Sequence, residues 1–272
     1  MSLVTDSPEQ KNLLTRVIIH FMTQSDFLRS IREYFWKQNF IEVEIPYLNS
    51  SLPLEPNIYS FKTTWIHKNK NYFLPTSPEF VLKKYLSKNR QNCFAVSHCF
   101  RDLENQNSLH TPEFLMLEWY EVGKNLDDLK KSTRKIITHF LPKIKFTHLV
   151  LPVSLPQNEP DFNQFFLNQI EPKLPQDKAV FITGYPAFLT PLAKSGNRFE
   201  LYINGIEIGN GCVENRNSAS IKKAFETETT YRQKNHLPLH PYSQEFVRIS
   251  NQLPPCSGIG LGIDRLLGII NL

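Results

Sequence analysis

The chain has 272 residues, 40% of them hydrophobic and 21% charged, which is the composition of a folded globular protein with a sizeable buried core. It contains no apolar run of the length that a membrane-spanning helix needs, and its first residues lack the basic-then-apolar pattern of a secretory signal. A formal net charge of +5 permits an acidic partner without requiring one, and four cysteines without CxxC spacing indicate reduced cytosolic thiols rather than disulfides or zinc.

The first third of the chain predicts two helices and two short strands. Apolar residues recur at helical spacing over residues 25–39, which predicts an amphipathic helix. Residues 40–46 predict a strand that ends at a proline, and residues 72–75 predict a second short strand. Ser77, Pro78 and Glu79 have the order of a helix start: a hydroxyl N-cap, a proline at the first helical position and an acid in the first turn.

The rest of the chain predicts an α+β fold, an antiparallel sheet flanked by helices. A hairpin is expected over residues 199–209, because Asn204-Gly205 supplies the positive backbone angles of a tight turn. Residues 142–178 contain six prolines and give no clear reading. The other expected elements are strands at 93–101 and 113–122, helices at 126–141 and 218–235, and a loop from there to residue 255.

The most informative stretch is residues 100–120, which read FRDLENQNSLHTPEFLMLEWY. Side chains of a strand alternate between its two faces, so Phe114, Met116, Glu118 and Tyr120 share one face. A flat ring, a carboxylate and a phenol beside Arg101 predict a site for a purine, a phosphate and an amine. The simpler interpretation of these residues alone is an ordinary antiparallel hairpin with a charged outer face.

This stretch resembles motif 2 of the class II aminoacyl-tRNA synthetases, in particular the lysyl branch and its truncated paralogues that modify elongation factor P. EVEIP at 42–46 resembles motif 1, and SGIGLGIDR at 257–265 resembles motif 3. TSPEF at 76–80 and EIGNGCVE at 207–214 also match this branch. Five matches in the family's order are too many to arise by chance.

The resemblance implies that the chain activates an amino acid with ATP, forming an aminoacyl adenylate. Arg101 is expected to hold the α-phosphate and the reacting carboxylate, and Arg265 the γ-phosphate, because a guanidinium fork can donate two hydrogen bonds to one phosphate. Both are therefore expected to be catalytic. The other implied ATP-binding residues are Glu104, His110, Phe114, Glu207 and Gly262.

The same resemblance implies a metal site and an amino-acid site. Glu207 and Glu214 match the family's magnesium-binding acids, and hard oxygen ligands suit Mg²⁺ held partly by phosphates. Glu79 and Glu118 match acids that meet substrate amino groups, so two carboxylates favour a diamino acid such as lysine or β-lysine. The full implied amino-acid set is Ser77, Glu79, Glu118, Tyr120 and Asn210.

Three features depart from the family's pattern. The loop from Arg101 to His110 is one residue longer than usual. After Glu214 the family has ELND or ELTD, whereas this chain has ENRN, with Arg216 near the expected pocket for a cationic substrate. The chain also stops at Leu272, which makes the motif-3 helix short.

The expected organisation is a single catalytic domain over residues 1–272, without the anticodon-binding barrel of lysyl-tRNA synthetases. This arrangement resembles the paralogues that transfer lysine or β-lysine to a lysine of elongation factor P, and motif 1 implies a homodimer. Two alternatives remain. One is a free-standing ligase that loads tRNA by its acceptor stem or loads another carrier; the other is a catalytically silent paralogue that binds ATP or an amino acid and regulates a partner.

Overall fold

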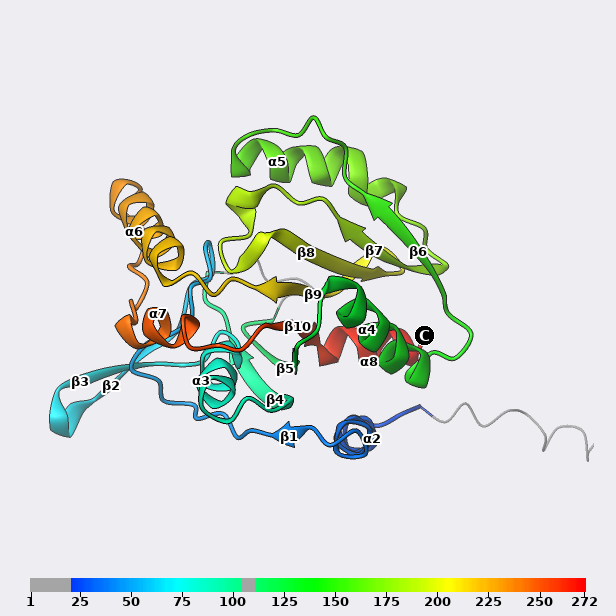
Figure 1. Cartoon of the computed structure of the whole chain (residues 1–272), viewed down its shortest axis with the longest axis horizontal. Helices are drawn as coiled ribbons and strands as arrows, with labels where there is room; N and C mark the ends of the chain where they lie inside the picture. Colours follow the sequence, from blue (N-terminus) through cyan, green and yellow to red (C-terminus); the bar gives the residue numbers. More distant parts are fainter. Residues whose placement is uncertain (1–20, 104–110) are drawn as a thin grey trace, which may run out of the picture.

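A computed structural model describes residues 21–103 and 111–272, and its centre is one eight-stranded sheet (Figure 1). Its strand order is β1-β4-β5-β10-β9-β8-β7-β6, and β2 (Lys62–Trp65) pairs with β3 (Lys70–Phe73) in a separate hairpin. The strands of the main sheet are β1 (Ile41–Glu42), β4 (Cys93–Phe100), β5 (Glu113–Val122), β6 (Lys145–Val150), β7 (Lys178–Thr183), β8 (Ala193–Ile203), β9 (Ile206–Glu214) and β10 (Cys256–Gly262).

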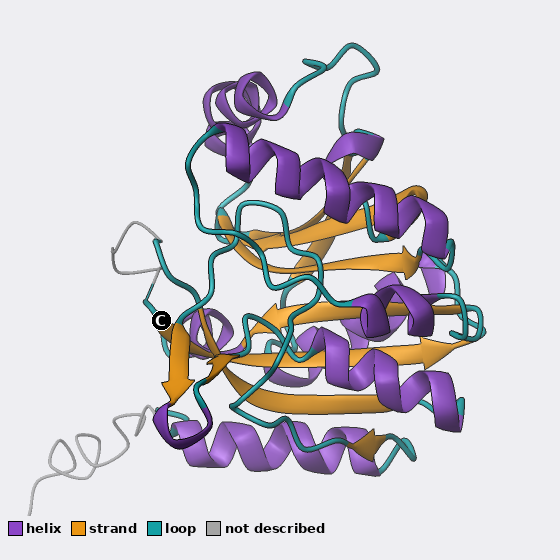
Figure 2. Cartoon of the chain, turned by 90° about the vertical axis from the view of Figure 1, so that its left-hand side faces the viewer, coloured by secondary structure: helices purple, strands orange, loops and turns teal. Residues whose placement is uncertain are grey.

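Helices lie in front of and behind the strands, as Figure 2 shows, so the predicted α+β fold is confirmed. No helix in the described ranges is both long and apolar enough to cross a membrane. The α-helices are α2 (Gln24–Trp36), α3 (Glu79–Asn89), α4 (Leu126–Phe140), α5 (Glu159–Phe165), α6 (Ser218–Lys234), α7 (Gln244–Ser250) and α8 (Ile263–Ile270).

The two faces of the sheet differ in chemistry, and β5 shows this most clearly. Leu115, Leu117 and Trp119 enter the main hydrophobic core, which the apolar sides of α2, α4 and α8 complete. Glu118 and Tyr120, on the alternate positions, line a cavity on the other face. The period-two pattern read from the sequence therefore separates core residues from cavity residues as predicted.

Several predicted elements are confirmed with their local causes. The β8–β9 hairpin turns at Asn204 and Gly205, whose φ angles are 52° and 72°. Helix α4 begins with a capping box, because the Asn125 side chain accepts from the Asp128 amide and the Asp128 side chain accepts from the Asn125 amide. The helix expected over residues 218–235 is α6, and the Asn217 side chain caps its start by accepting from the Ser220 amide.

Other predictions differ from the structure. The outer pairs β1–β4 and β6–β7 are parallel, and the strand expected over residues 40–46 is only two residues long. Residues 236–255 are not all loop, since Ser243 caps the short helix α7 and accepts from the Phe246 amide. Residues 142–178 contain β6 and α5, whose signals the prolines obscure.

The expected N-cap at Ser77 is also wrong. Helix α3 starts at Glu79 with Pro78 in the cap position and no side-chain cap hydrogen bond. Ser77 is buried and lines a cavity instead. Its side chain therefore belongs to the cavity wall rather than to the helix terminus.

Candidate active site

Two adjoining cavities lie over the central strands. The first, of about 380 Å³, is lined by Glu79, Glu118 and Glu214 among other acids, and is called the acidic cavity. The second, of about 450 Å³, is lined by both Arg101 and Arg265 and is called the arginine cavity. The residues common to both are Arg101, Met116, Asn210 and Gly260.

The arginine cavity brings together those residues expected to bind ATP that the structure describes. The Arg101 guanidinium carbon lies 5.1 Å from the centre of the Phe114 ring. Arg265, at the start of α8, donates from Nη1 to the Glu207 carbonyl oxygen at 2.8 Å. A Cβ on Gly209 would come within 2.4 Å of the Gly260 carbonyl oxygen, so only glycine lets β9 and β10 approach here. Gly262 lines the same cavity.

A bulge in β9 turns Glu207 toward the arginine cavity. Leu201 pairs with Gly209, but Tyr202 pairs with Glu207, so Ile208 is an extra residue and packs into the core. Glu207 therefore faces the side of the sheet that carries Glu200. Burial first, and then the charge of Glu200, raise the pKa of Glu207 to about 7.

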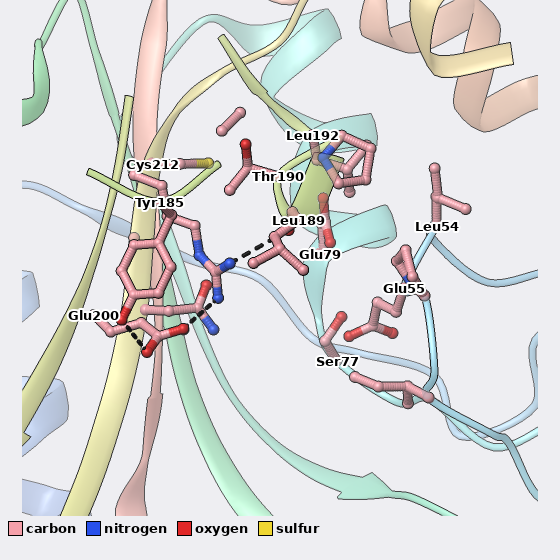
Figure 3. A pocket seen from close by; sticks show the side chains of 18 of the residues that line it. Leu54, Glu55, Ser77, Glu79, Tyr185, Leu189, Thr190, Leu192, Glu200 and Cys212 are labelled. Carbon is pink, nitrogen blue, oxygen red and sulfur yellow. Dashed lines mark hydrogen bonds and ion pairs between the residues drawn. The ribbon is translucent and has the colours of Figure 1, made fainter. Parts of the chain in front are cut away.

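The acidic cavity contains the residues expected to bind the amino acid. Figure 3 shows Ser77 and Glu79 on one side of the cavity and Glu200 on the other. Across its floor, the Tyr120 hydroxyl donates to Glu118 Oε1 at 2.6 Å. A Cβ on Gly258 would lie 2.4 Å from the Tyr120 ring, so this glycine makes room for the phenol.

Acids outnumber cations on the lining of the acidic cavity. Six glutamates line it, against two arginines, Arg101 and Arg198. Burial, together with the neighbouring Glu79 carboxylate, raises the pKa of Glu118 well above its ordinary value. A cationic ligand would relieve this cost by giving the carboxylates a partner of opposite charge.

Lys83 is an internal cation that the sequence interpretation missed. Its side chain is only 2% exposed, pairs with Glu214 Oε2 at 2.5 Å and also binds Glu79 Oε1. Burial alone would lower the pKa of Lys83, but the Glu214 and Glu79 carboxylates raise it overall. The signal for this contact was available, because Glu79 and Lys83 are four residues apart on one helix.

The two acids predicted to bind magnesium line different cavities in the structure. Glu207 lines the arginine cavity, whereas Glu214 lines the acidic cavity and is paired with the Lys83 ammonium. The acid whose charge acts on Glu207 most strongly is Glu200, which accepts from Arg198 at 2.6 Å and from the Tyr202 hydroxyl at 3.1 Å. Within the described ranges, no three acid, histidine or cysteine side chains gather as a preformed metal cluster.

The other expected residues fall into three groups. Asn210 lines both cavities. Glu104 and His110 lie outside the described residues. Arg216, which departs from the family's pattern, is exposed and donates to the Leu253 carbonyl oxygen at 3.2 Å, away from both cavity linings.

Comparison with known proteins decides the family. The sequence profile described as tRNA synthetases class II (D, K and N) matches residues 14–271. The chain belongs to the class II aminoacyl-tRNA synthetase family. This membership accounts for the order of the five motifs and for the antiparallel strands at the centre of the sheet.

The similar proteins include several that share one name, elongation factor P--(R)-beta-lysine ligase. The protein of that name from Hamiltonella defensa is 28% identical over 92% of this chain and 90% of its own length. One from Pseudoalteromonas translucida is 30% identical over 88% of this chain and 87% of its own length. A protein from Aquifex aeolicus named as a homolog of this ligase is 31% identical over 89% of this chain and 92% of its own length.

Proposed function

We propose that this protein is an ATP-dependent ligase that activates lysine or β-lysine as an aminoacyl adenylate and transfers it to a lysine side chain of elongation factor P. The observation that carries the proposal is the position of Arg101. Its guanidinium lies where the acidic cavity and the arginine cavity meet. A carboxylate from one cavity and an α-phosphate from the other can therefore share one planar fork of donors.

The proposed first step is attack of the amino acid's carboxylate oxygen on the α-phosphorus of ATP, with pyrophosphate leaving. This step needs two anions held in line and stabilisation of the charge that develops on the phosphate oxygens. Arg101 serves the reacting end, and Arg265, which also lines the arginine cavity, serves the terminal phosphates. The Phe114 ring in the same cavity supplies a flat apolar surface for the adenine.

Glu207, together with Glu200 and the nucleotide's phosphates, is the proposed holder of Mg²⁺, which would neutralise phosphate charge when bound. The fit rests on two neighbouring carboxylates of which one, Glu207, has its pKa raised to about 7 by burial and by the other. Glu214 fits this role less well than the sequence implied, because it shares no cavity lining with Glu207, whereas Glu200 and Glu207 line one cavity together. We assign Glu214 to the amino-acid site instead.

A diamino acid is the proposed substrate class. Glu79, Glu118 and Glu214 approach the acidic cavity from three elements, α3, β5 and β9. Two ammonium groups on the ligand would each find a carboxylate there, while the ligand's carboxylate would meet Arg101. Ser77, Tyr120 and Asn210 supply the neutral donors and acceptors of the same site.

Pyrophosphate exchange tests the activation step. The protein should exchange labelled pyrophosphate into ATP when given lysine or β-lysine, and not when given leucine or glutamate. The absence of exchange with every diamino acid would contradict the proposal and favour the silent, regulatory alternative. The outward position of Arg216 argues against that alternative, since it adds no charge to the cavity.

A labelled transfer assay tests the acceptor. Elongation factor P is proposed as the acceptor because the similar ligases are named for it. Radiolabelled amino acid, ATP and the enzyme should place label on elongation factor P and not on bulk tRNA. Label on tRNA alone would instead support the free-standing ligase that loads an acceptor stem.

We expect the binding of Mg-ATP to release a proton below about pH 7. The folded protein keeps a proton on Glu207 between its ordinary pKa of 4.5 and its raised pKa of about 7. The contribution of Glu207 to the free energy of unfolding therefore falls as the pH rises through this window. A cation bound to the ionised carboxylate would offset that loss by stabilising its negative charge. Calorimetry in two buffers of different ionisation enthalpy measures the released proton, which should disappear in Glu207→Gln. An equal release by that variant would contradict the assignment.

A homodimer is proposed through the motif-1 region. Trp36, Ile41, Tyr47 and Leu48 are each more than two-fifths exposed and apolar, and they follow one another from the end of α2 past β1. We expect light scattering to give the mass of two chains, and the pair Tyr47→Asp and Leu48→Asp to give the mass of one. A single-chain mass for the unaltered protein would contradict this prediction.

A further inference from the structure

Glu55 is a partly buried acid beside Arg101 in the acidic cavity, and the mechanism proposed above gives it no role. It lies in the segment between β1 and β2, and its side chain is 12% exposed. Its Oε1 is 3.8 Å from Arg101 Nη2, and its Oε2 accepts a hydrogen bond from the Thr76 hydroxyl. Figure 3 shows Glu55 beside Ser77, on the side of the cavity away from Glu200.

The backbone around Glu55 is held by a buried cation. Arg232 of α6 is 2% exposed, and its Nη2 donates to the Ile58 carbonyl oxygen at 2.9 Å and to the Glu55 carbonyl oxygen at 3.4 Å. Glu228 accepts from the same arginine at 2.5 Å. The position of the Glu55 carboxylate is therefore fixed by the fold rather than by an exposed loop.

The other acids of the acidic cavity have partners other than Arg101, and three of them belong to the proposed amino-acid site. Lys83 pairs with Glu79 and Glu214, and Tyr120 donates to Glu118. Among the described residues, the ion pairs of Arg101 include one acid, Glu55, and this contact is loose at 3.8 Å. Glu55 therefore lies beside the guanidinium that would hold the reacting carbonyl, without a close cation of its own.

The transfer step creates a need for a base at this place. A lysine acceptor is an ammonium at neutral pH, with an ordinary pKa of about 10.4, and an ammonium nitrogen has no lone pair for attack. One proton must leave before the carbon–nitrogen bond forms. Among side chains near the reacting carbonyl, the guanidinium of Arg101 cannot accept this proton, whereas an ionised carboxylate can.

We propose that Glu55 is the general base of the transfer step. Its carboxylate takes one proton from the acceptor ammonium, the freed amine attacks the carbonyl carbon of the adenylate, and the bond from that carbon to the AMP oxygen breaks. The remaining extra proton on the nitrogen leaves with AMP or to solvent, which balances the step without any further reagent. This inference rests on the proposed function, since it requires an adenylate and an amine acceptor.

The charges around Glu55 are consistent with this role. Burial raises the pKa of Glu55, Arg101 lowers it and Glu79 raises it again, with a net increase that makes the carboxylate a stronger base. Glu118, from β5, faces the same group, and burial there also raises the pKa of its carboxyl. The Thr76 hydroxyl, which donates to Glu55, limits the increase.

Replacement of Glu55 by glutamine separates the two half-reactions. Pyrophosphate exchange and the KM for lysine should stay within about threefold of the unaltered protein, because activation needs no base here. Transfer to elongation factor P should fall by about a hundredfold or more, the usual contribution of a general base. Hydroxylamine, which is a neutral nucleophile at pH 7, should still be converted to the hydroxamate at close to the normal rate.

Other outcomes identify other roles for Glu55. Equal losses of exchange and transfer would overturn the proposal and make Glu55 a positioning residue for Arg101. A raised KM for lysine would make it a ligand of the substrate ammonium, and unchanged transfer would leave it without a role; both also overturn the proposal. If Glu55→Gln does not fold, Glu55→Asp tests the proposal instead. Aspartate keeps the carboxyl group but is one methylene shorter, so this variant should lower the transfer rate and leave pyrophosphate exchange unchanged.

The control is Glu245→Gln. Glu245 also pairs with a cation, Lys84 at 2.8 Å, but lies outside both cavities. It should leave exchange, hydroxamate formation and transfer unchanged. A lack of exchange by the unaltered protein would instead refute the proposed function itself, so the two failures remain distinguishable.

Discussion

Substitution of Arg101 by lysine should lower pyrophosphate exchange by about a thousandfold while leaving the fold intact. Lysine keeps the positive charge but replaces a planar fork of donors by a single ammonium, which cannot serve a phosphate and a carboxylate together. Removal of one preorganised donor from a developing anion typically costs 10²- to 10³-fold, and the proposed mechanism gives Arg101 two anions to hold. The measurement is the exchange rate at saturating lysine and ATP.

The matched control for this substitution is Arg134→Lys. Both arginines lie over a phenylalanine ring, Arg101 at 5.1 Å from Phe114 and Arg134 at 4.7 Å from Phe146. Arg134 belongs to α4, which packs on the core side of the sheet, and it lines neither cavity. Its replacement should leave exchange unchanged. Similar losses in the two variants would show that stacking on a ring, rather than a place between the cavities, explains the effect.

The sequence predicted the central strands and their faces well because the causes are local. Alternation along residues 113–122 assigns Phe114, Met116, Glu118 and Tyr120 to the cavity side without any knowledge of neighbouring strands. The Asn204-Gly205 turn likewise depends on the backbone freedom of two residues. Such signals survive in a single sequence, since each depends on residues close together in the chain.

The sequence could not predict which acids share a cavity. Glu207 and Glu214 are seven residues apart on one strand, and only the bulge at Ile208 determines that Glu207 turns toward Glu200. Glu55 reaches Arg101 from a segment without regular structure, and Arg232 holds that segment from the far end of α6. These contacts depend on tertiary packing, which leaves no periodic trace in the chain.

Substitution of Lys83 by methionine should cost about 3–5 kcal/mol of unfolding free energy, the penalty for leaving buried charge without its partner. The methionine side chain has nearly the same volume as the aliphatic part of lysine. The main loss is therefore the ammonium group between Glu79 and Glu214. Lys83 also lowers the pKa of Glu214, which burial would otherwise raise further. The variant should therefore become less stable as the pH rises and its buried carboxyls ionise.

Urea unfolding of the Lys83→Met variant at about pH 5.5 and pH 8 measures both effects, with the larger loss expected at the higher pH. Lys84→Met is the control. Lys84 follows Lys83 in the sequence, but its side chain is 43% exposed and pairs with Glu245 at 2.8 Å on the surface. An exposed pair contributes about 1 kcal/mol or less, so this variant should lose little stability at either pH. A similar loss from both substitutions would mean that Lys83 acts through helix α3 alone. A loss confined to Lys83, and growing with pH, would instead show that the acidic cavity depends on an internal cation to offset the charge of its buried carboxylates.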